Sequence, residues 1–349
     1  MIKKYILIFI ISLIISYILT PLMKKIAFLI EGFDNPSERR INKKPVPNTG
    51  GIAIFIAFII SYFIFNDHSL STYGIIFAST IIFLLGLIDD IFEMSPLLKL
   101  LGQIGAASIL IYYGIQINFI TNPFGGMIYL GVFSIPVTIL WIVGITNTIN
   151  LIDGLDGLAA GISIIATVIL FAVALQEARL FPVVLAIALM GSLTGFLRYN
   201  FFPADIFMGD SGSQFTGFIL AAISVTGALK SAAAVTIVVP ILALGVPIFD
   251  TLFAIIRRVY HNKPIGEADK GHIHHRLIAL GWSHKQAVIL VYGSSILLGG
   301  TALIINGLNL KNGMILFALS IACVIYGAWK LGIFSRELSK DSKVLEESN

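Results

Sequence analysis

The chain has 349 residues, of which 57% are hydrophobic and only 12% are charged, and its formal net charge is +4. Soluble domains carry about a quarter charged residues, so this composition excludes an ordinary soluble globular protein. The one cysteine, Cys323, excludes an intrachain disulfide.

Long apolar runs, nearly free of charge, recur from one end of the sequence to the other, and each is long enough to cross a bilayer. Only helices and closed barrels satisfy their backbone polar groups inside a membrane, and these runs are too long for barrel strands. The sequence therefore predicts an all-α, polytopic membrane helical bundle with about eleven transmembrane helices. We expect their centres near Phe9, Ala57, Phe83, Ala106, Leu140, Ile165, Leu185, Ile219, Leu242, Leu297 and Phe317.

Two of the runs carry additional signals. The first follows Lys3 and Lys4, as in a signal peptide, but no small-residue cleavage site follows it, so we expect a retained helix. The ninth, roughly residues 232–256, contains Pro240, Gly245 and Pro247. These residues predict a kink, because proline removes a helical hydrogen bond.

The connections between runs alternate between long polar loops and short bland ones, and all but five of the 23 Lys and Arg residues lie on the polar side. The positive-inside rule makes that side cytoplasmic. An odd number of spans then places the N-terminus outside and the C-terminus in the cytoplasm, in a plasma or inner membrane. We expect one transmembrane domain over residues 1–331 and a short cytoplasmic tail over residues 332–349.

Acidic residues gather on the same side, which the positive-inside rule does not require. All of the 19 Asp and Glu residues except Asp67 and Glu177 fall at or near the cytoplasmic face. Several adjoin helix ends, where a charge is unfavourable without a partner or a metal. Isolated acids can be solvated loop charges, but the clustered ones favour a functional site in the cytoplasmic loops.

The first polar loop, residues 34–51, is basic and contains Pro45, Pro47 and a double glycine. Attraction to anionic lipid headgroups would explain its charges. It does not explain the prolines and glycines, which indicate a fixed loop shape. We include Arg40 and Lys43 among the candidate substrate-binding residues.

Asp89 and Asp90 end an apolar helix as two adjacent carboxylates. Like charges this close repel each other unless a cation intervenes, and Asp at a helix C-terminus opposes the helix dipole. A divalent metal or a general base would explain the pair, and a solvated helix end is the alternative.

Asn147, Asn150, Asp153 and Asp156 recur at every third position in the next polar segment. On a helix such residues lie on one face. Glycines at 154 and 157 would let a ligand approach the backbone closely. The stripe suits contacts with sugar, phosphate and metal, and an ordinary polar turn is the alternative.

The fourth polar loop contains Asn200 and Phe207, and then Asp210 among small residues just before a span. Mg²⁺ usually takes one or two protein carboxylates and completes its shell with water and phosphate, so Asp210 is a candidate metal ligand. It could instead cap the following helix. Phe207 could stack on a base or simply pack against lipid.

The last polar loop is cationic, with Arg257 and Arg258 followed by the cluster His272-Ile273-His274-His275-Arg276. Three of the chain's six histidines lie in this short cluster. His and Arg are natural hydrogen-bond donors to phosphate, so we expect the loop to bind phosphate. A structural zinc site is the alternative, but it would need further Cys or His ligands nearby.

Together the loops place carboxylates that suit a divalent metal beside cations that suit phosphate, as phosphoryl transfer requires. With these clusters, the chain resembles the polyprenyl-phosphate N-acetylhexosamine-1-phosphate transferase family (glycosyltransferase family 4). Within the family it is similar to the bacterial undecaprenyl-phosphate N-acetylglucosamine-1-phosphate transferases. The matching segments follow the family's order between residues 34 and 285, and they are residues 47–51, 89–90, 150–157, 200–212 and 269–276.

The resemblance implies that residues 1–331 form a transferase domain. Its reaction would transfer N-acetylglucosamine 1-phosphate from UDP-N-acetylglucosamine to undecaprenyl phosphate and release UMP, with Mg²⁺ or Mn²⁺ as cofactor. The product would be the first lipid-linked intermediate of a surface polymer of the teichoic acid or O-antigen type. The implied partners are a UDP-N-acetylhexosamine, undecaprenyl phosphate and membrane lipid, with no nucleic acid, and related enzymes often form homodimers.

The resemblance also implies residue roles. Asp210 would hold the metal on the pyrophosphate, and Asp89 and Asp90 would deprotonate or position the lipid phosphate. Asn150, Asp153 and Asp156 would orient the nucleotide and metal, with Asp153 a second metal ligand. The remaining candidates would bind the nucleotide, its phosphates or the sugar, and they are Asn200, Phe207, Arg257, His272, His274, His275 and Arg276.

Two alternatives stay open. The related phospho-N-acetylmuramoyl-pentapeptide transferases share the acidic motifs, but typically carry three consecutive histidines after Pro-Ile and about ten spans. A transporter would place polar residues near the bilayer midplane. Here the span interiors are almost free of charge, with Asp250 as the main exception.

Overall fold

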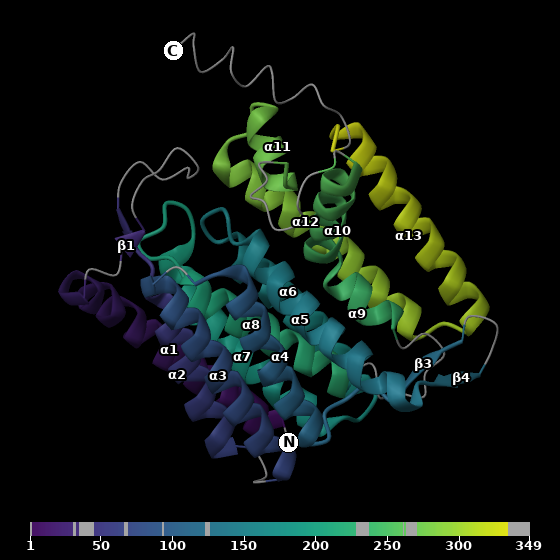
Figure 1. The fold of residues 1–349 in the computed structure, drawn as a ribbon, viewed down its shortest axis with the longest axis horizontal. Coiled ribbons are helices and arrows are strands. Elements are labelled where there is room, and N and C mark those ends of the chain that lie inside the picture. The colour runs from purple at the N-terminus through teal and green to yellow at the C-terminus, as the bar shows by residue number, and fades with distance from the viewer. Residues whose placement is uncertain are drawn as a thin grey trace.

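The computed structural model of the chain describes residues 2–30, 33–34, 45–65, 69–92, 94–122, 126–227, 237–260, 262 and 271–333. These residues form a helical bundle with two short hairpins, which confirms the all-α class (Figure 1). The long helices are α1 (Ile2–Ile30), α2 (Gly50–Phe65), α3 (Leu70–Phe92), α4 (Pro96–Tyr112), α5 (Ser134–Ile152), α6 (Leu158–Gln176), α7 (Leu180–Asn200), α8 (Gly209–Thr226), α10 (Gly245–Tyr260), α12 (His284–Asn306) and α13 (Leu310–Lys330). The shorter elements are α9 (Val238–Ala243), α11 (Ile273–Ala279), a 3-10 turn (Gly131–Phe133) and the antiparallel pairs β1 (Phe33–Asp34) with β2 (Val46–Pro47) and β3 (Phe119–Thr121) with β4 (Met127–Tyr129).

Seven helices in the described part of the chain are long and apolar enough to cross a membrane, and they are α1, α3, α5 with its preceding turn, α6, α7, α12 and α13. The chain is therefore a multi-pass membrane protein. A helix also lies at each predicted span centre, but α2 and α4 are shorter apolar helices. The total of about eleven crossings stays a prediction.

Helix α8 forms the centre of the bundle, since every residue from Ser211 to Thr226 is buried. Helices α2, α3, α5 and α7 pack around it. At the outside of the bundle, α13 exposes large apolar side chains such as Leu319 and Trp329, as expected for a helix that faces lipid. Because α8 is central, its first turn lies in the middle of one end of the bundle.

The predicted kink in the ninth run is confirmed. The described part of this run is divided at Leu244, where α9 ends and α10 begins. Pro247 lies in the first turn of α10, where a missing backbone N–H does least harm. Residues 232–236 of the predicted run lie outside the described residues.

The two ends of the bundle differ. Hairpin β1–β2 and α11 lie at one end, whereas the start of α1 and hairpin β3–β4 lie at the other (Figure 1). The described parts of the predicted polar loops share the first of these ends. Hydrogen bonds join the first four loops, and the last loop approaches the third where His274 meets Gly154, as described below. Which end faces the cytoplasm stays a prediction.

Candidate active site

Glycines allow α2 and α3 to approach the first turn of α8. A Cβ atom on Gly51 would lie 2.3 Å from the backbone nitrogen of Gly212, and one on Gly86 would lie 2.6 Å from the carbonyl oxygen of Asp210. A side chain at either position would push the helices apart. Backbone hydrogen bonds from Gly50 to Phe207 and from Gly51 to Met208, both of 2.9 Å, complete this junction.

Asp90, at the end of α3, caps the N-terminus of α8. Its Oδ1 accepts a hydrogen bond from the backbone N–H of Asp210 at 2.7 Å, and its Oδ2 accepts one from Ser211 at 3.0 Å. These are two of the N–H groups that a helix leaves unpaired in its first turn. The sequence offered Asp210 as a possible cap for α8, whereas the structure shows that Asp90 has this role and leaves the Asp210 carboxylate for other contacts.

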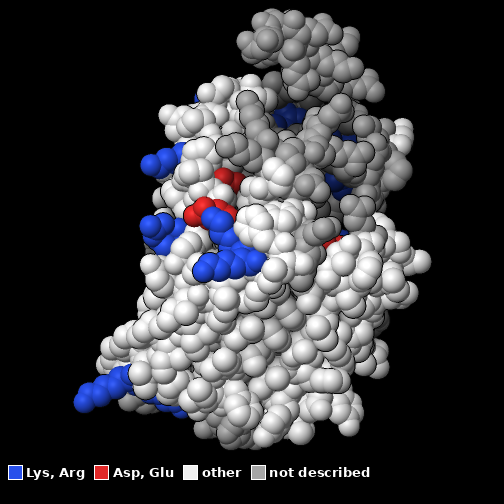
Figure 2. All heavy atoms as spheres, turned by 90° about the vertical axis from the view of Figure 1, so that its left-hand side faces the viewer, with Lys and Arg blue, Asp and Glu red and all other residues white. Residues whose placement is uncertain are grey.

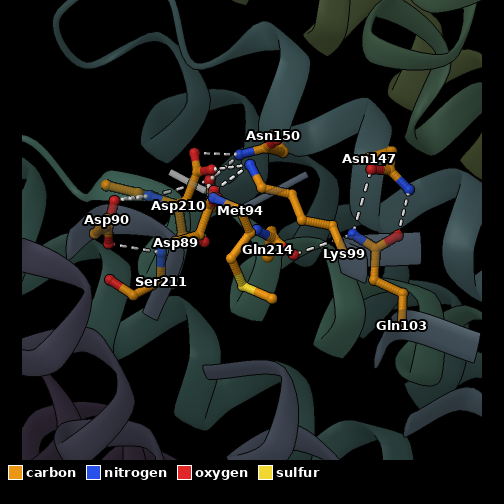
Figure 3. A network of polar contacts seen from close by, with 12 residues as sticks. Asp89, Asp90, Met94, Lys99, Gln103, Asn147, Asn150, Asp210, Ser211 and Gln214 are labelled. Atoms are coloured by element: carbon orange, nitrogen blue, oxygen red, sulfur yellow. Dashed lines mark hydrogen bonds and ion pairs between the residues drawn. The ribbon is translucent and has the colours of Figure 1, made fainter. Parts of the chain in front are cut away.

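Lys99 joins the carboxylates of Asp89 and Asp210 (Figure 3). Its Nζ lies 2.7 Å from Oδ2 of Asp210 and also forms an ion pair with Asp89. Asp89 is buried and additionally accepts a hydrogen bond from the backbone N–H of Met94 at 2.7 Å. Because Asp89 and Asp90 are adjacent on a helix, their side chains diverge, and each has its own partners.

Asn150 completes the contacts of Asp210 from the side of α5. Its Nδ2 donates to Oδ1 of Asp210 and to Oγ of Ser213, both at 2.8 Å. One carboxylate therefore meets residues of α4 and α5 and adjoins the Asp90 cap from α3 (Figure 3).

The predicted helical stripe is only half helical. Helix α5 ends at Ile152, so Asn147 and Asn150 share its face, but Asp153 and Asp156 lie in the turn that follows. Gly157, with φ of 76°, ends the turn in a left-handed conformation that favours glycine. The expectation that all four residues lie on one helix is therefore wrong.

Asp153 stands out because its carboxylate makes no hydrogen bond or ion pair with any described residue. Burial raises the pKa of this carboxyl group to about 8, and the negative charges of Asp210, Asp90 and Asp156 act in the same direction. By contrast, Asp156 accepts a hydrogen bond from the backbone N–H of Ala204 at 2.9 Å. Within the described part of the chain, Asp153 thus faces other carboxylates without a compensating cation.

Asn200 is buried and holds two loops together. Its Oδ1 accepts a hydrogen bond from the backbone N–H of Gly157 at 3.1 Å, and its Nδ2 donates to the carbonyl of Ile206 at 2.9 Å. Phe207 lies beside hairpin β1–β2, because its backbone N–H donates to Pro47 at 2.7 Å. The predicted contacts of both residues with a nucleotide stay predictions.

The histidine cluster is anchored to α10 through Asp250. Oδ2 of Asp250 lies 2.8 Å from Nδ1 of His272, and Oδ1 accepts a hydrogen bond from the backbone N–H of Ile273 at 2.8 Å. Both side chains are buried. These two contacts hold α11 at a fixed position against the bundle. Asp250, the main charged residue within the predicted spans, therefore has a clear structural partner.

His274 reaches the turn that carries Asp153. A Cβ atom on Gly154 would lie 2.5 Å from Nε2 of His274, so only glycine allows this approach. His274 is 2% exposed, and neither ring nitrogen makes a hydrogen bond within the described structure. Burial, together with the smaller effect of the neighbouring His275, whose ring centroid is 4.3 Å away, lowers the pKa of His274 to about 3.

The other basic candidates divide into two groups. Arg257 and Arg276 are buried and donate to the backbone carbonyls of Ile333 and Gly332, which links the histidine cluster to the end of α13. Arg40 and Lys43, together with the motif residue Asp269, lie outside the described residues.

Acidic and basic side chains also lie close together on the surface of the molecule. In Figure 2 most of the exposed acidic atoms form a group in the upper half, and Lys and Arg border them. Most of the surface below is uncharged, apart from basic atoms at the lower edge. Acidic and basic groups are therefore neighbours on this face, above a largely uncharged surface.

Comparison with known proteins decides the family. A family model described as glycosyl transferase family 4 matches residues 72–228. The chain is 42% identical over 321 residues to a probable undecaprenyl-phosphate N-acetylglucosaminyl 1-phosphate transferase of Bacillus subtilis (strain 168), which covers 91% of this chain and 88% of that protein. The chain belongs to glycosyl transferase family 4.

Two further relatives place this transferase within the family. It is 36% identical to a decaprenyl-phosphate N-acetylglucosaminephosphotransferase of Mycobacterium leprae (strain TN), over 80% of this chain and 78% of that protein. It is 30% identical to a phospho-N-acetylmuramoyl-pentapeptide-transferase of Clostridium botulinum (strain Alaska E43 / Type E3), over 79% of this chain and 87% of that protein. The matched family region runs from α3 to α8 and contains the contacts of Asp89, Lys99 and Asp210.

The residues of this transferase fit a magnesium ion held by few protein ligands. Among the described residues, no three His, Cys, Asp or Glu side chains are grouped as a metal site. Mg²⁺ does not need such a group, since water and phosphate usually supply most of its ligands. The Asp153 carboxylate, which has no partner among the described residues and is influenced by the charge of Asp210, is what a site for such an ion would provide.

The sequence did not identify every residue of this site in the transferase. In the sequence Lys99 is only one of the charges on the polar side, and no pattern singles out Gln103 or Gln214. The sequence does contain a sign that Lys99 is special, since it is the only Lys or Arg between the first polar loop (residues 34–51) and Arg179. Its partner Asp210 lies 111 positions away, so only the fold could show their contact.

Proposed function

We propose that this transferase moves N-acetylglucosamine 1-phosphate from UDP-N-acetylglucosamine to undecaprenyl phosphate. An oxygen of the lipid phosphate would attack the phosphorus atom that carries the sugar. The bond between that phosphorus and the bridging oxygen then breaks, and UMP leaves with the bridging oxygen. The product would be the first lipid-linked intermediate of a surface polymer of the teichoic acid or O-antigen type.

The observation that carries the proposal is the meeting of Asp89, Lys99 and Asp210 at the end of the bundle. Phosphoryl transfer depends mainly on positioning and on neutralising the charge of phosphate oxygens. Lys99 supplies a cation for those oxygens, and the carboxylates supply ligands for a second one. The exposed apolar surface of the surrounding helices leaves the site within reach of a lipid.

Asp153 and Asp210 are the residues that would hold Mg²⁺. When bound, this ion would polarise the diphosphate and neutralise negative charge as the leaving group departs. Asn150 would keep the Asp210 carboxylate in a fixed orientation through its 2.8 Å hydrogen bond. Asp90 would keep the same residue in place through the backbone.

The lipid phosphate needs little activation, because it is already an anionic nucleophile. Direct attack is therefore the favoured course, and attack through a covalent phospho-aspartate is the alternative. The uncharged His274, whose ring nitrogens have no hydrogen-bond partner among the described residues, would donate a hydrogen bond to the phosphates or sugar from the side of the Asp153 turn. The cytoplasmic placement of this site rests on the charge distribution of the loops.

The second candidate is the muramoyl-pentapeptide reaction, which the relative of that name favours at 30% identity. The 42% identity to the protein named as an N-acetylglucosaminyl 1-phosphate transferase favours the first candidate. Both reactions use the same phosphate chemistry and differ in the sugar.

The test is a reaction of the purified protein in detergent with undecaprenyl phosphate, Mg²⁺ and either UDP-N-acetylglucosamine or UDP-N-acetylmuramoyl-pentapeptide. We expect UMP release with the first donor only, and none with Asp210→Ala. Turnover with the second donor alone would support the second candidate. No turnover of any UDP-N-acetylhexosamine would reject the proposed transfer.

A further inference from the structure

A cluster of three amide side chains lies beneath the Asp210 contacts, and it consists of Gln103, Asn147 and Gln214 (Figure 3). Nε2 of Gln103 donates to Oε1 of Gln214 at 3.0 Å and to Oδ1 of Asn147 at 3.3 Å. In return, Nδ2 of Asn147 donates to Oε1 of Gln103 at 2.6 Å. Each residue comes from a different helix, α4, α5 or α8.

Each amide lies one helical turn from a residue of the candidate active site on its own helix. Gln103 follows Lys99 by four positions on α4, and Gln214 follows Asp210 by four positions on α8. Asn147 precedes Asn150 by three positions on α5. Residues three or four apart on a helix are neighbours on one face, so the cluster forms a second layer directly under the first.

The environment makes these contacts restrictive. Gln103 is 2% exposed and Gln214 is fully buried within the bundle. A buried amide is unfavourable unless it is hydrogen-bonded, so rotating or sliding one of the three helices would leave amide groups unpaired. Interhelical amide contacts therefore select one register among the many that apolar packing alone would tolerate.

We propose that Gln103, Asn147 and Gln214 are positioning residues that set the register of α4, α5 and α8, and thereby bring Lys99 and Asn150 onto Asp210. This inference rests on the proposed function, because it concerns the residues assigned to phosphate and metal binding. The amides touch no reacting atom in this assignment. Their effect acts through the residue one turn away on each helix.

The cluster is not built for stability alone. The NH₂ group of Gln214 is buried and donates to no described residue, so the cluster keeps one unpaired donor. Replacing a whole polar group by apolar side chains of similar shape is often neutral or stabilising, whereas removing one partner is unfavourable. Stability and positioning can therefore be separated by comparing single with triple replacements.

The experiment compares Gln103→Met with the triple variant Gln103→Met/Asn147→Leu/Gln214→Met. The matched control is Trp141→Phe/Ser224→Ala, which removes a 2.8 Å hydrogen bond between α5 and α8 away from the site. We expect the triple variant to unfold at or above the temperature of the single variant. Its kcat should fall by about tenfold or more, as for misplaced catalytic groups, whereas the control should keep the wild-type rate.

A measurement independent of turnover follows the position of Lys99 itself. Its side chain is 25% exposed and is paired with two carboxylates, which protects the amine from acylation. Treatment with acetic anhydride followed by mass spectrometry should show faster acylation of Lys99 in the triple variant than in the wild type or the control.

The outcomes separate the two proposals. An inactive wild-type protein would reject the proposed function, and the acylation rate of Lys99 would still decide the role of the amides. An active wild type together with a folded triple variant of normal kcat and normal Lys99 acylation would overturn the positioning role. If the triple variant were more stable and more active than Gln103→Met, with both quantities near the wild-type values, the amides would likewise have a merely structural role.

Discussion

The carboxylate of Asp90 accepts a hydrogen bond from the backbone N–H of Asp210, with 2.7 Å between Oδ1 and the nitrogen. Asp210 can therefore direct its own side chain to Lys99 and Asn150 while its backbone is held by α3. Two neighbouring acids of one motif thus have different tasks, because Asp89 meets the cation and Asp90 meets the helix end.

Asp90→Asn should weaken both the fold and the activity. An amide has only one oxygen, so its NH₂ group would face one of the two N–H groups that the carboxylate now binds. We expect a loss of about 1 kcal/mol in unfolding free energy, as for other helix caps, and a fall in UMP release. Thermal unfolding in detergent and the UMP assay measure the two effects. Asp205→Asn is the control, because Asp205 is an exposed partner of Lys24 and should change neither quantity.

Lys99→Met should strongly reduce the rate. The replacement keeps the length of the side chain but removes the cation between Asp89 and Asp210. We expect kcat to fall about 10²- to 10³-fold, as when other preorganised charge-stabilising donors are removed. Lys24→Met removes an equally long cation outside the site and should be active. A Lys99→Met enzyme with a normal kcat would exclude Lys99 from the charge neutralisation.

Asp153→Asn should remove the response of the protein to Mg²⁺. The wild-type carboxylate faces other acids without a described partner, so the neutral amide should leave the metal-free protein at least as stable. Added Mg²⁺ should raise the unfolding temperature of the wild type and not of the variant, and EDTA should abolish wild-type activity. An equal Mg²⁺-induced shift in both proteins would show that Asp153 is not a ligand.

His274 should make the fold sensitive to acid. Its folded pKa of about 3 lies below the ordinary value of 6.5, so the folded state keeps His274 uncharged where the unfolded chain is protonated. The stability linked to this group is present above pH 6.5 and is lost as the pH falls from 6.5 towards 3. The limiting slope is about 1.4 kcal/mol per pH unit.

His274→Asn should flatten this part of the profile, which unfolding measurements between pH 7 and pH 4 can follow. Asp205→Asn again serves as control, because its exposed ion pair contributes little. Parallel profiles for the wild type and His274→Asn would show that another group causes the acid sensitivity.

The sequence by itself determined the class of this protein and most candidate residues. Apolar runs specify membrane helices because the bilayer leaves the backbone no other partners. The kink at Pro240 to Pro247 was equally readable, because proline acts through its own covalent structure. Clusters such as Asp89-Asp90 were visible because charges beside apolar helices are rare.

Only the tertiary structure decided which of these residues meet. Neither the contact of Lys99 with Asp210 nor that of Asp250 with His272 could be derived from local patterns, since each joins separate helices. The end of α5 at Ile152, which separates Asp153 from the helical stripe, depends on the following glycine turn and its packing. Helix register is determined by side-chain packing and interhelical hydrogen bonds, and these exist only once the bundle has assembled.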